Sequence, residues 1–140
     1  MSRYLLDTCV ISEPLKRQPD KRVLDWWRSR DDLMLYLPTL VIGELEKGIQ
    51  KLPDTRRRAH LKRTMESIIE RFGTRILPVD TAVALCWGRL MADCEQKGSP
   101  VPAIDGLIAA TAIAHDLVVV TRNIDDFVQT GVPTFNPFEK

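Results

Sequence analysis

Short apolar runs of strand length alternate along this chain with longer stretches in which apolar residues recur every three or four positions. The short runs predict β-strands, and the longer stretches, each apolar on one side, predict amphipathic helices. Strands are expected at 3–6, 34–37, 75–79, 117–120 and, among prolines, within 132–138. Strand–helix alternation indicates an α/β fold: an open, mostly parallel sheet with helices on both faces.

The helical stretches carry recognisable end signals. Helices are expected at about 8–15, 23–30, 39–49, 55–72, 81–97 and 105–115. Thr39 and Asp80 are expected to cap two of them, because short polar side chains accept hydrogen bonds from the free N–H groups of a first turn. Gly73 is expected to end the helix before it, because glycine tolerates the left-handed conformation common at that point. The last strand is expected at a sheet edge, where prolines are tolerated.

The segment 101–127 combines a helix and a strand in one apolar unit. Its helix is apolar on every side, which predicts burial nearly all round. The strand that follows is a continuous valine-rich run, typical of a parallel strand covered on both faces. Acidic residues stand only at the two ends of this unit: Asp105 opens the helix, and Asp125 and Asp126 follow the strand.

Length, charge and cysteine content restrict the class of protein. The 140 residues suit one domain, 1–140, with a sizeable core. Twenty basic residues against 19 acidic ones give no global preference for nucleic acid or a membrane surface. Cys9, Cys86 and Cys94 lack metal-ligand spacing, and no signal peptide or membrane span appears. We expect a soluble cytoplasmic protein with reduced cysteines.

Four carboxylates fall where the strands of such a sheet end. Asp7 follows the first strand, Glu44 lies one turn into the helix after the second, Asp105 opens the core helix and Asp126 follows the fourth strand. Ligand sites of open parallel sheets lie beyond the carboxyl ends of the strands. Carboxylates crowded together repel one another, so the cluster predicts a hard cation, Mg²⁺ or Mn²⁺.

Each acid also has an ordinary structural explanation. Asp7 or Asp105 could be a helix N-cap, Glu44 a solvated helix flank, and Asp126 part of a turn. Other catalytic arrangements are missing, because the chain has no GxxxxGKS, GxGxxG or GxSxG motif. His60 and His115 have no evident nucleophile to activate and are expected to be structural.

A phosphoacceptor role for Asp7 is a second enzymatic interpretation. An aspartyl phosphatase would carry another aspartate two positions on, where this chain has Cys9. A receiver domain would have a lysine after a late strand, where the nearest residue is Arg122. Both departures count against this interpretation.

Motifs spread along nearly the whole chain occur in this order: LLDTCVISE at 5–13, TLVIGELEKGI at 39–49, IDGLIAATAIAH at 104–115, VVVTRNIDDF at 118–127 and GVPTFNPFE at 131–139. Together they resemble the PIN-domain toxins of the VapC/FitB type. The resemblance implies a three-layer fold with the strand order 3-2-1-4-5. It also implies a Mg²⁺- or Mn²⁺-dependent endoribonuclease that acts as the toxin of a toxin–antitoxin pair.

The resemblance also assigns roles. It makes Asp7, Glu44, Asp105 and Asp126 the catalytic acids, Asp7 and Asp105 the direct metal ligands, and Thr121 and Asn123 the residues that position the substrate. The implied partners are RNA, a VapB/FitA-like antitoxin, a second copy of the chain in a homodimer, heterotetramer or larger complex, and operator DNA bound through the antitoxin. No membrane partner is implied. Cys9 departs from the pattern, which usually has asparagine there.

A basic segment stands apart from this acidic cluster. Residues 51–75 hold eight basic side chains against three acidic ones. The helix expected at 55–72, which carries most of these side chains, could be a solvated surface, a track for RNA or a surface for the antitoxin. The alternative to an enzyme is a non-catalytic PIN-like module that binds nucleic acid or a protein, although such a module would not need to keep a repelling cluster of four acids.

Overall fold

Five parallel strands form one sheet in the computed structural model, which describes residues 2–139. The strands are β1 (Tyr4–Leu6), β2 (Leu35–Pro38), β3 (Ile76–Leu77), β4 (Val118–Val120) and β5 (Thr134–Phe135). Their order is β3-β2-β1-β4-β5, and β5 lies at an edge. The expected strand order and the edge position of β5 are confirmed.

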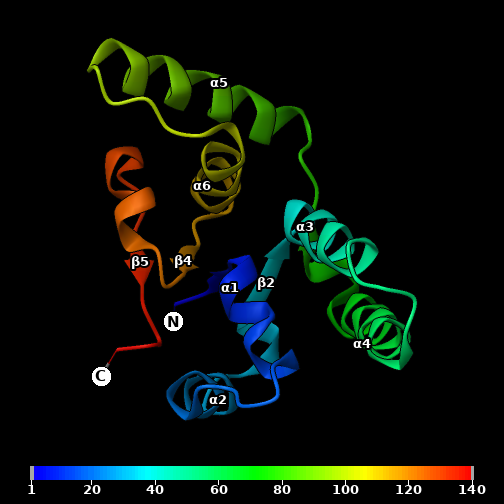
Figure 1. Cartoon of the computed structure of the whole chain (residues 1–140). Helices are drawn as coiled ribbons and strands as arrows, with labels where there is room; N and C mark the ends of the chain where they lie inside the picture. Colours follow the sequence, from blue (N-terminus) through cyan, green and yellow to red (C-terminus); the bar gives the residue numbers. More distant parts are fainter. Residues whose placement is uncertain (1, 140) are drawn as a thin grey trace.

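Helices cover both faces of this sheet (Figure 1). The α-helices are α1 (Thr8–Ile11), α2 (Lys21–Arg28), α3 (Thr39–Gln50), α4 (Arg56–Phe72), α5 (Thr81–Gln96) and α6 (Ala103–His115). Short 3₁₀ helices are η1 (Glu13–Leu15), η2 (Asp32–Met34), η3 (Gly73–Arg75), η4 (Ile124–Asp126) and η5 (Val128–Thr130). No helix in the range 2–139 has the length and apolarity needed to cross a membrane.

The two faces of the sheet belong to two separate cores, because side chains alternate along a strand. Leu6 and Val120 point into the core shared with α1, α2, α3 and α4. Leu5 and Val119, their neighbours in the sequence, point into the core shared with α6. Leu6 lies opposite Val120 in the parallel register of β1 and β4. The result is the expected three-layer arrangement.

Two expected helix ends are confirmed. Asp80 caps α5 by accepting a hydrogen bond from the Val83 N–H at 2.9 Å. Gly73 follows α4 as its C-cap with a φ of 50°, and Thr55, which was not predicted as a cap, caps its start.

Three expectations about helices are wrong. The helix expected over 8–15 is broken at Ser12 into α1 and η1. Thr39 is not an N-cap, because Pro38 occupies that position and no side chain caps α3. The core helix α6 is not buried all round: Ile104 and Ile113 are each 42% exposed. One side of α6 faces the sheet and another packs on α5, which leaves these two isoleucines uncovered.

The contact between α5 and α6 depends on a missing side chain at Gly106. A Cβ there would lie 2.6 Å from Met91 Sδ and 3.2 Å from Trp87 Nε1. We expect Gly106→Ala to leave the protein about 1 kcal/mol less stable than Gly88→Ala does, because Met91 and Trp87 must move to make room for the new methyl group. Gly88→Ala in α5 is the matched control: its Cβ meets nothing within 4 Å, so it should stabilise the protein by up to about 1 kcal/mol. Urea unfolding of both variants tests this, and equal effects would contradict it.

Candidate active site

The site forms where the winding of the sheet reverses. From β1 the chain crosses over to β2 on one side, and β4 pairs with β1 on the other. The backbone N–H of Asp7 donates to the carbonyl of Val120 at 3.0 Å, which extends the ladder by one residue. Asp7 and Thr121, the first residues after the two strands, therefore emerge side by side.

Asp7 is held from two sides. Its Oδ1 accepts a hydrogen bond from the backbone N–H of Thr8 at 2.8 Å, which caps α1. Its Oδ2 accepts one from the Thr121 hydroxyl at 2.9 Å. The side chain is buried, with an exposed fraction of 9% for the residue. The capping explanation of Asp7 is thus correct, and it is compatible with a place in the site.

Glu44 reaches the same region from α3. It is exposed, as its position on the flank of the helix predicted. The hydroxyl of Thr8 donates a hydrogen bond to its Oε1 at 2.5 Å. Thr8 therefore connects Asp7, through its backbone, with Glu44, through its side chain. Thr8 was not among the residues predicted from the sequence; its place beside Asp7 in the first motif was the available signal.

Asp105 and Asp126 complete the group of acids. Asp105 lies in the first turn of α6 and is half-buried; the helix begins two residues before it, so Asp105 does not cap it. Asp126 is exposed at the end of η4, and its backbone N–H donates to the carbonyl of Asn123 at 3.0 Å, an ordinary turn interaction.

The four carboxylates influence one another electrostatically. Burial raises the pKa of Asp7, and the negative charges of Glu44 and Asp126 add to this effect. Burial also raises the pKa of Asp105, with further contributions from Asp126, Asp7 and Glu44. Like charges raise the pKa of a carboxyl only when they are close, so the structure brings these acids together.

The chemistry of this group fits a hard divalent cation. Carboxylate oxygens are the ligands that Mg²⁺ and Mn²⁺ prefer, and a cation would relieve the mutual repulsion of the acids. Among residues 2–139, no three His, Cys, Asp or Glu side chains already form a group spaced to hold an ion. The acids thus surround a shared region without forming a preassembled cage.

Thr121 is the centre of a small hydrogen-bond network. Its hydroxyl donates to Asp7 and accepts from the backbone N–H of Asn123 at 2.9 Å. Because Thr121 is fully buried, its contact is with Asp7 and not with solvent. Asn123 is exposed and adjoins the site through its backbone.

Cys9 adjoins the same network. Its Sγ lies 3.9 Å from Asp7 Oδ2 and 3.7 Å from the Thr121 hydroxyl, and it accepts a hydrogen bond from the Arg122 N–H at 3.4 Å. Burial raises the pKa of this thiol, and the Asp7 carboxylate raises it further. The thiol is therefore neutral at pH 7. It occupies the position near Asp7 at which the resemblance implies asparagine.

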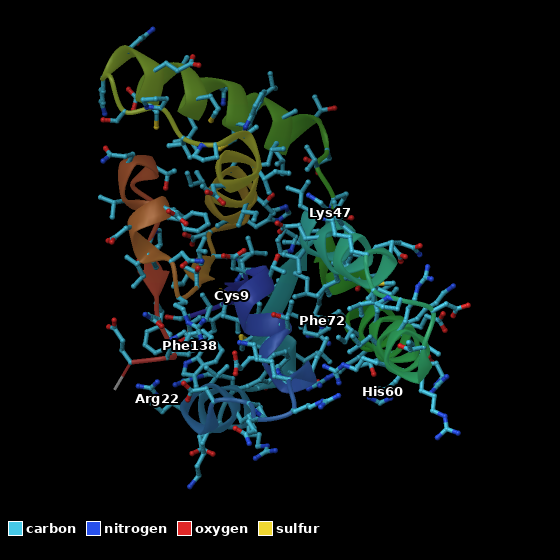
Figure 2. All side chains as sticks on the ribbon, viewed as in Figure 1. Cys9, Arg22, Lys47, His60, Phe72 and Phe138 are labelled. Atoms are coloured by element: carbon cyan, nitrogen blue, oxygen red, sulfur yellow. The ribbon has the colours of Figure 1, made fainter. Side chains whose placement is uncertain are left out.

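The two histidines lie outside this site. His60 is exposed on α4, at the periphery of the molecule, whereas Cys9 lies on α1 near its centre (Figure 2). His115 ends α6, where its carbonyl accepts a hydrogen bond from the Arg3 guanidinium at 2.6 Å. Within residues 2–139, neither histidine is hydrogen-bonded to one of the four acids.

Comparison with known proteins places the chain in a family. The PIN domain family matches residues 4–132. Toxin FitB of Neisseria gonorrhoeae is 39% identical over 96% of this chain and 97% of its own length. VapC ribonuclease Y4jK of Sinorhizobium fredii is 35% identical over 96% of this chain and 97% of its own length. A chain of FitAB bound to an IR36 DNA fragment superposes with a TM-score of 0.93, at 38% identity over 98% of this chain and 96% of that one. The chain therefore belongs to the PIN domain family, and the expected resemblance to its FitB and VapC members is confirmed.

Proposed function

We propose that this protein is a Mg²⁺- or Mn²⁺-dependent endoribonuclease that acts as the toxin of a toxin–antitoxin pair. The observation that carries the proposal is the convergence of Asp7, Glu44, Asp105 and Asp126 at the end of β1 and β4. The charges of Glu44 and Asp126 add to the effect of burial on the pKa of Asp7, and those of Asp126, Asp7 and Glu44 add to it at Asp105. The ribonuclease activity of a relative, VapC ribonuclease Y4jK, supports the assignment to RNA.

The proposed roles follow from how each side chain is held. Asp7 and Asp105 would bind the metal directly, since they are the more buried of the four acids. Glu44 and Asp126 are exposed and would complete the site through water or a second ion. A divalent cation bound there would supply a water of lowered pKa and neutralise charge on the scissile phosphate. Thr121 orients the Asp7 carboxylate. Thr121 and the exposed Asn123 would position the substrate.

A non-catalytic binding module explains these contacts less well. Thr121 and Thr8 each use a hydroxyl to fix the orientation of an acid. Fixed, mutually repelling carboxylates are a cost to folding unless a ligand uses them. The arrangement therefore favours an enzyme.

We also propose a small protein antitoxin of the VapB/FitA kind as the partner. Neighbouring solved structures are toxin–antitoxin complexes, some of them bound to DNA, which supports an antitoxin that carries the complex to its operator. An apolar groove of about 310 Å³ between α3 and α4 begins at Thr8 and Glu44 and includes Leu45, Ile49 and Met65. An apolar segment bound there would end beside the acids. A homodimer, assembled with antitoxin into a heterotetramer or larger complex in the cytoplasm, completes the proposal.

Cleavage of total cellular RNA tests the catalytic part. Purified protein is incubated with RNA in Mg²⁺, in Mn²⁺ and in EDTA, and the new ends are mapped. We expect discrete cuts with either ion and none with EDTA. Cuts that persist in EDTA would contradict a metal-dependent mechanism. RNA that is bound but never cut would instead support the non-catalytic module.

Substitution of Cys9 tests its relation to Asp7. We expect Cys9→Asn to keep or raise the cleavage rate, because an amide can donate to Asp7 Oδ2, from which the thiol lies at 3.9 Å. Losing a partner of a metal ligand typically costs about 10- to 100-fold. Cys86→Asn, a half-buried cysteine on α5, is the control for general damage. A folded but inactive Cys9→Asn would show that this site depends on the thiol.

A further inference from the structure

Glu13 is a buried carboxylate that the proposed mechanism does not use. Only 2% of the residue is exposed, although it lies in the short 3₁₀ helix η1. Its Oε2 accepts a hydrogen bond from the Asp20 N–H at 2.8 Å. Its Oε1 has no well-formed hydrogen bond within residues 2–139 and is compensated by charge, with Lys16 Nζ at 3.0 Å and Arg122 Nη2 at 3.8 Å.

The partner that connects Glu13 to the site is Arg122. This residue stands between Thr121, which orients Asp7, and Asn123, whose N–H binds the Thr121 hydroxyl. Its Nη2 lies 3.8 Å from Glu13 Oε1, and its guanidinium carbon lies over the Phe138 ring, 3.8 Å from the centroid. The carboxylate favours one position of the guanidinium, and the aromatic face favours one orientation of its plane.

The backbone of Arg122 is restrained as well. Its N–H donates to Cys9 Sγ at 3.4 Å, and its carbonyl lies 3.5 Å from the Asn136 amide. The Asn136 side chain accepts a hydrogen bond from the N–H of Phe138 at 2.8 Å, and Phe138, labelled in Figure 2, is buried in the core under α1 and α2. The loop that follows β4 is therefore clamped between the first motif of the chain and its C-terminal segment.

We propose that Glu13 is a positioning residue of the active site: its buried carboxylate holds the Arg122 guanidinium against Phe138 and so fixes residues 121–126, which carry Thr121 and Asp126. This inference rests on the proposed function. A merely structural Glu13 would use its Asp20 and Lys16 contacts to hold η1 to the start of α2, with no effect beyond them. The two possibilities differ in where the effect of a substitution appears.

Glu13→Gln separates them, because its amide oxygen can still accept from Asp20 while the charge that attracts Arg122 is lost. Lys16→Met is the matched control: it removes the other cation and leaves Arg122 in place. Arg122→Met breaks the same contact from the half-exposed side and gives a result should Glu13→Gln fail to fold. For each variant we would measure the melting temperature, single-turnover RNA cleavage and amide hydrogen exchange.

We expect Glu13→Gln to speed exchange at Arg122, Asn123 and Asp126, whose N–H groups donate to Cys9, Thr121 and Asn123 respectively, while Val118 in β4 stays protected. Cleavage should fall about 10- to 100-fold. Lys16→Met should leave amide exchange in the loop and RNA cleavage nearly unchanged. Once Arg122 is methionine, Glu13→Gln should slow cleavage no further.

The proposal would be overturned if Glu13→Gln speeded amide exchange only at residues 13–20. It would also be overturned if Glu13→Gln and Lys16→Met reduced RNA cleavage equally. Independent effects of Glu13→Gln and Arg122→Met on the cleavage rate would also overturn it. Absence of cleavage by the wild-type protein with either ion would contradict the proposed function instead. The exchange measurements need no RNA, so they would still decide whether Glu13 fixes the loop.

Discussion

Asp7→Asn and Asp105→Asn are each expected to reduce RNA cleavage by about 10³-fold or more. A metal at a phosphoryl-transfer site stabilises the transition state by several kcal/mol, and about 1.4 kcal/mol corresponds to a factor of ten in rate. Asn keeps the size of the side chain and the capping of α1, so the fold should persist. Single-turnover assays in Mg²⁺ and Mn²⁺ measure the effect.

Metal binding gives a readout that does not depend on activity. Millimolar Mg²⁺ or Mn²⁺ should raise the melting temperature of the wild-type protein, because an ion that binds only the folded state stabilises it. The two variants should gain little. Asp125→Asn, which removes an exposed carboxylate next to Asp126, is the control and should behave like wild type. Equal metal stabilisation of wild type, Asp7→Asn and Asp105→Asn would exclude these two acids as ligands.

The Asp7→Asn variant also measures how much the burial of the Asp7 carboxylate destabilises the fold. Burial, aided by Glu44 and Asp126, raises its pKa above the ordinary value of 3.8. A carboxyl with a higher pKa in the folded state destabilises the fold once the pH exceeds the unfolded value, and this cost disappears as the pH falls below it. Without metal, Asp7→Asn should therefore melt at a higher temperature than wild type at pH 7. The difference should shrink as the pH approaches 3.8.

Parallel topology explains why the main acids could be predicted from the sequence. Asp7 and Asp126 follow buried apolar runs, and the carboxyl ends of parallel strands meet at one edge. The expectation that α6 is buried on every side was wrong because it came from residue type alone and not from topology. Periodicity records which residues are apolar, and it does not show that Ile104 and Ile113 lack a covering element. A cap prediction also failed at Thr39, because the chain enters α3 directly from Pro38.

Hydrophobic periodicity and strand order do not predict which side chains of distant segments form hydrogen bonds. The Thr8 hydroxyl meets Glu44 across 36 positions, and Thr121 meets Asp7 across 114. Glu13 in the first motif gave no sign of burial, because its partners Asp20 and Arg122 come from a turn and from the loop after β4. Such side chains are identified only when the fold has placed both partners.

The basic end of α4 gives the second large expected effect. Replacing Arg56, Arg57 and Arg58 with glutamine should weaken RNA binding, because the substitutions remove three positive charges from the first turn of α4. The salt dependence of binding should flatten by up to about 0.7 in slope for each phosphate of a single strand that the protein no longer neutralises. The chemical step at saturating RNA should change little, since Arg57 and Arg58 are hydrogen-bonded to Leu15 and Gln50 and not to the acids. Fluorescence anisotropy with labelled RNA over a range of salt concentrations measures both the affinity and its salt dependence.

Two features of α4 set the controls. Arg57 donates to the carbonyl of Leu15 at 3.0 Å and Arg58 to Gln50 at 2.7 Å, so the melting temperature must be measured alongside binding. Arg71→Gln, at the other end of α4, removes an arginine already paired with Asp32 at 2.5 Å and should leave the salt slope unchanged. A loss of antitoxin affinity with an unchanged RNA slope would assign the basic end to the protein partner. No change in either would identify these arginines as a solvated surface that only balances the acidic site.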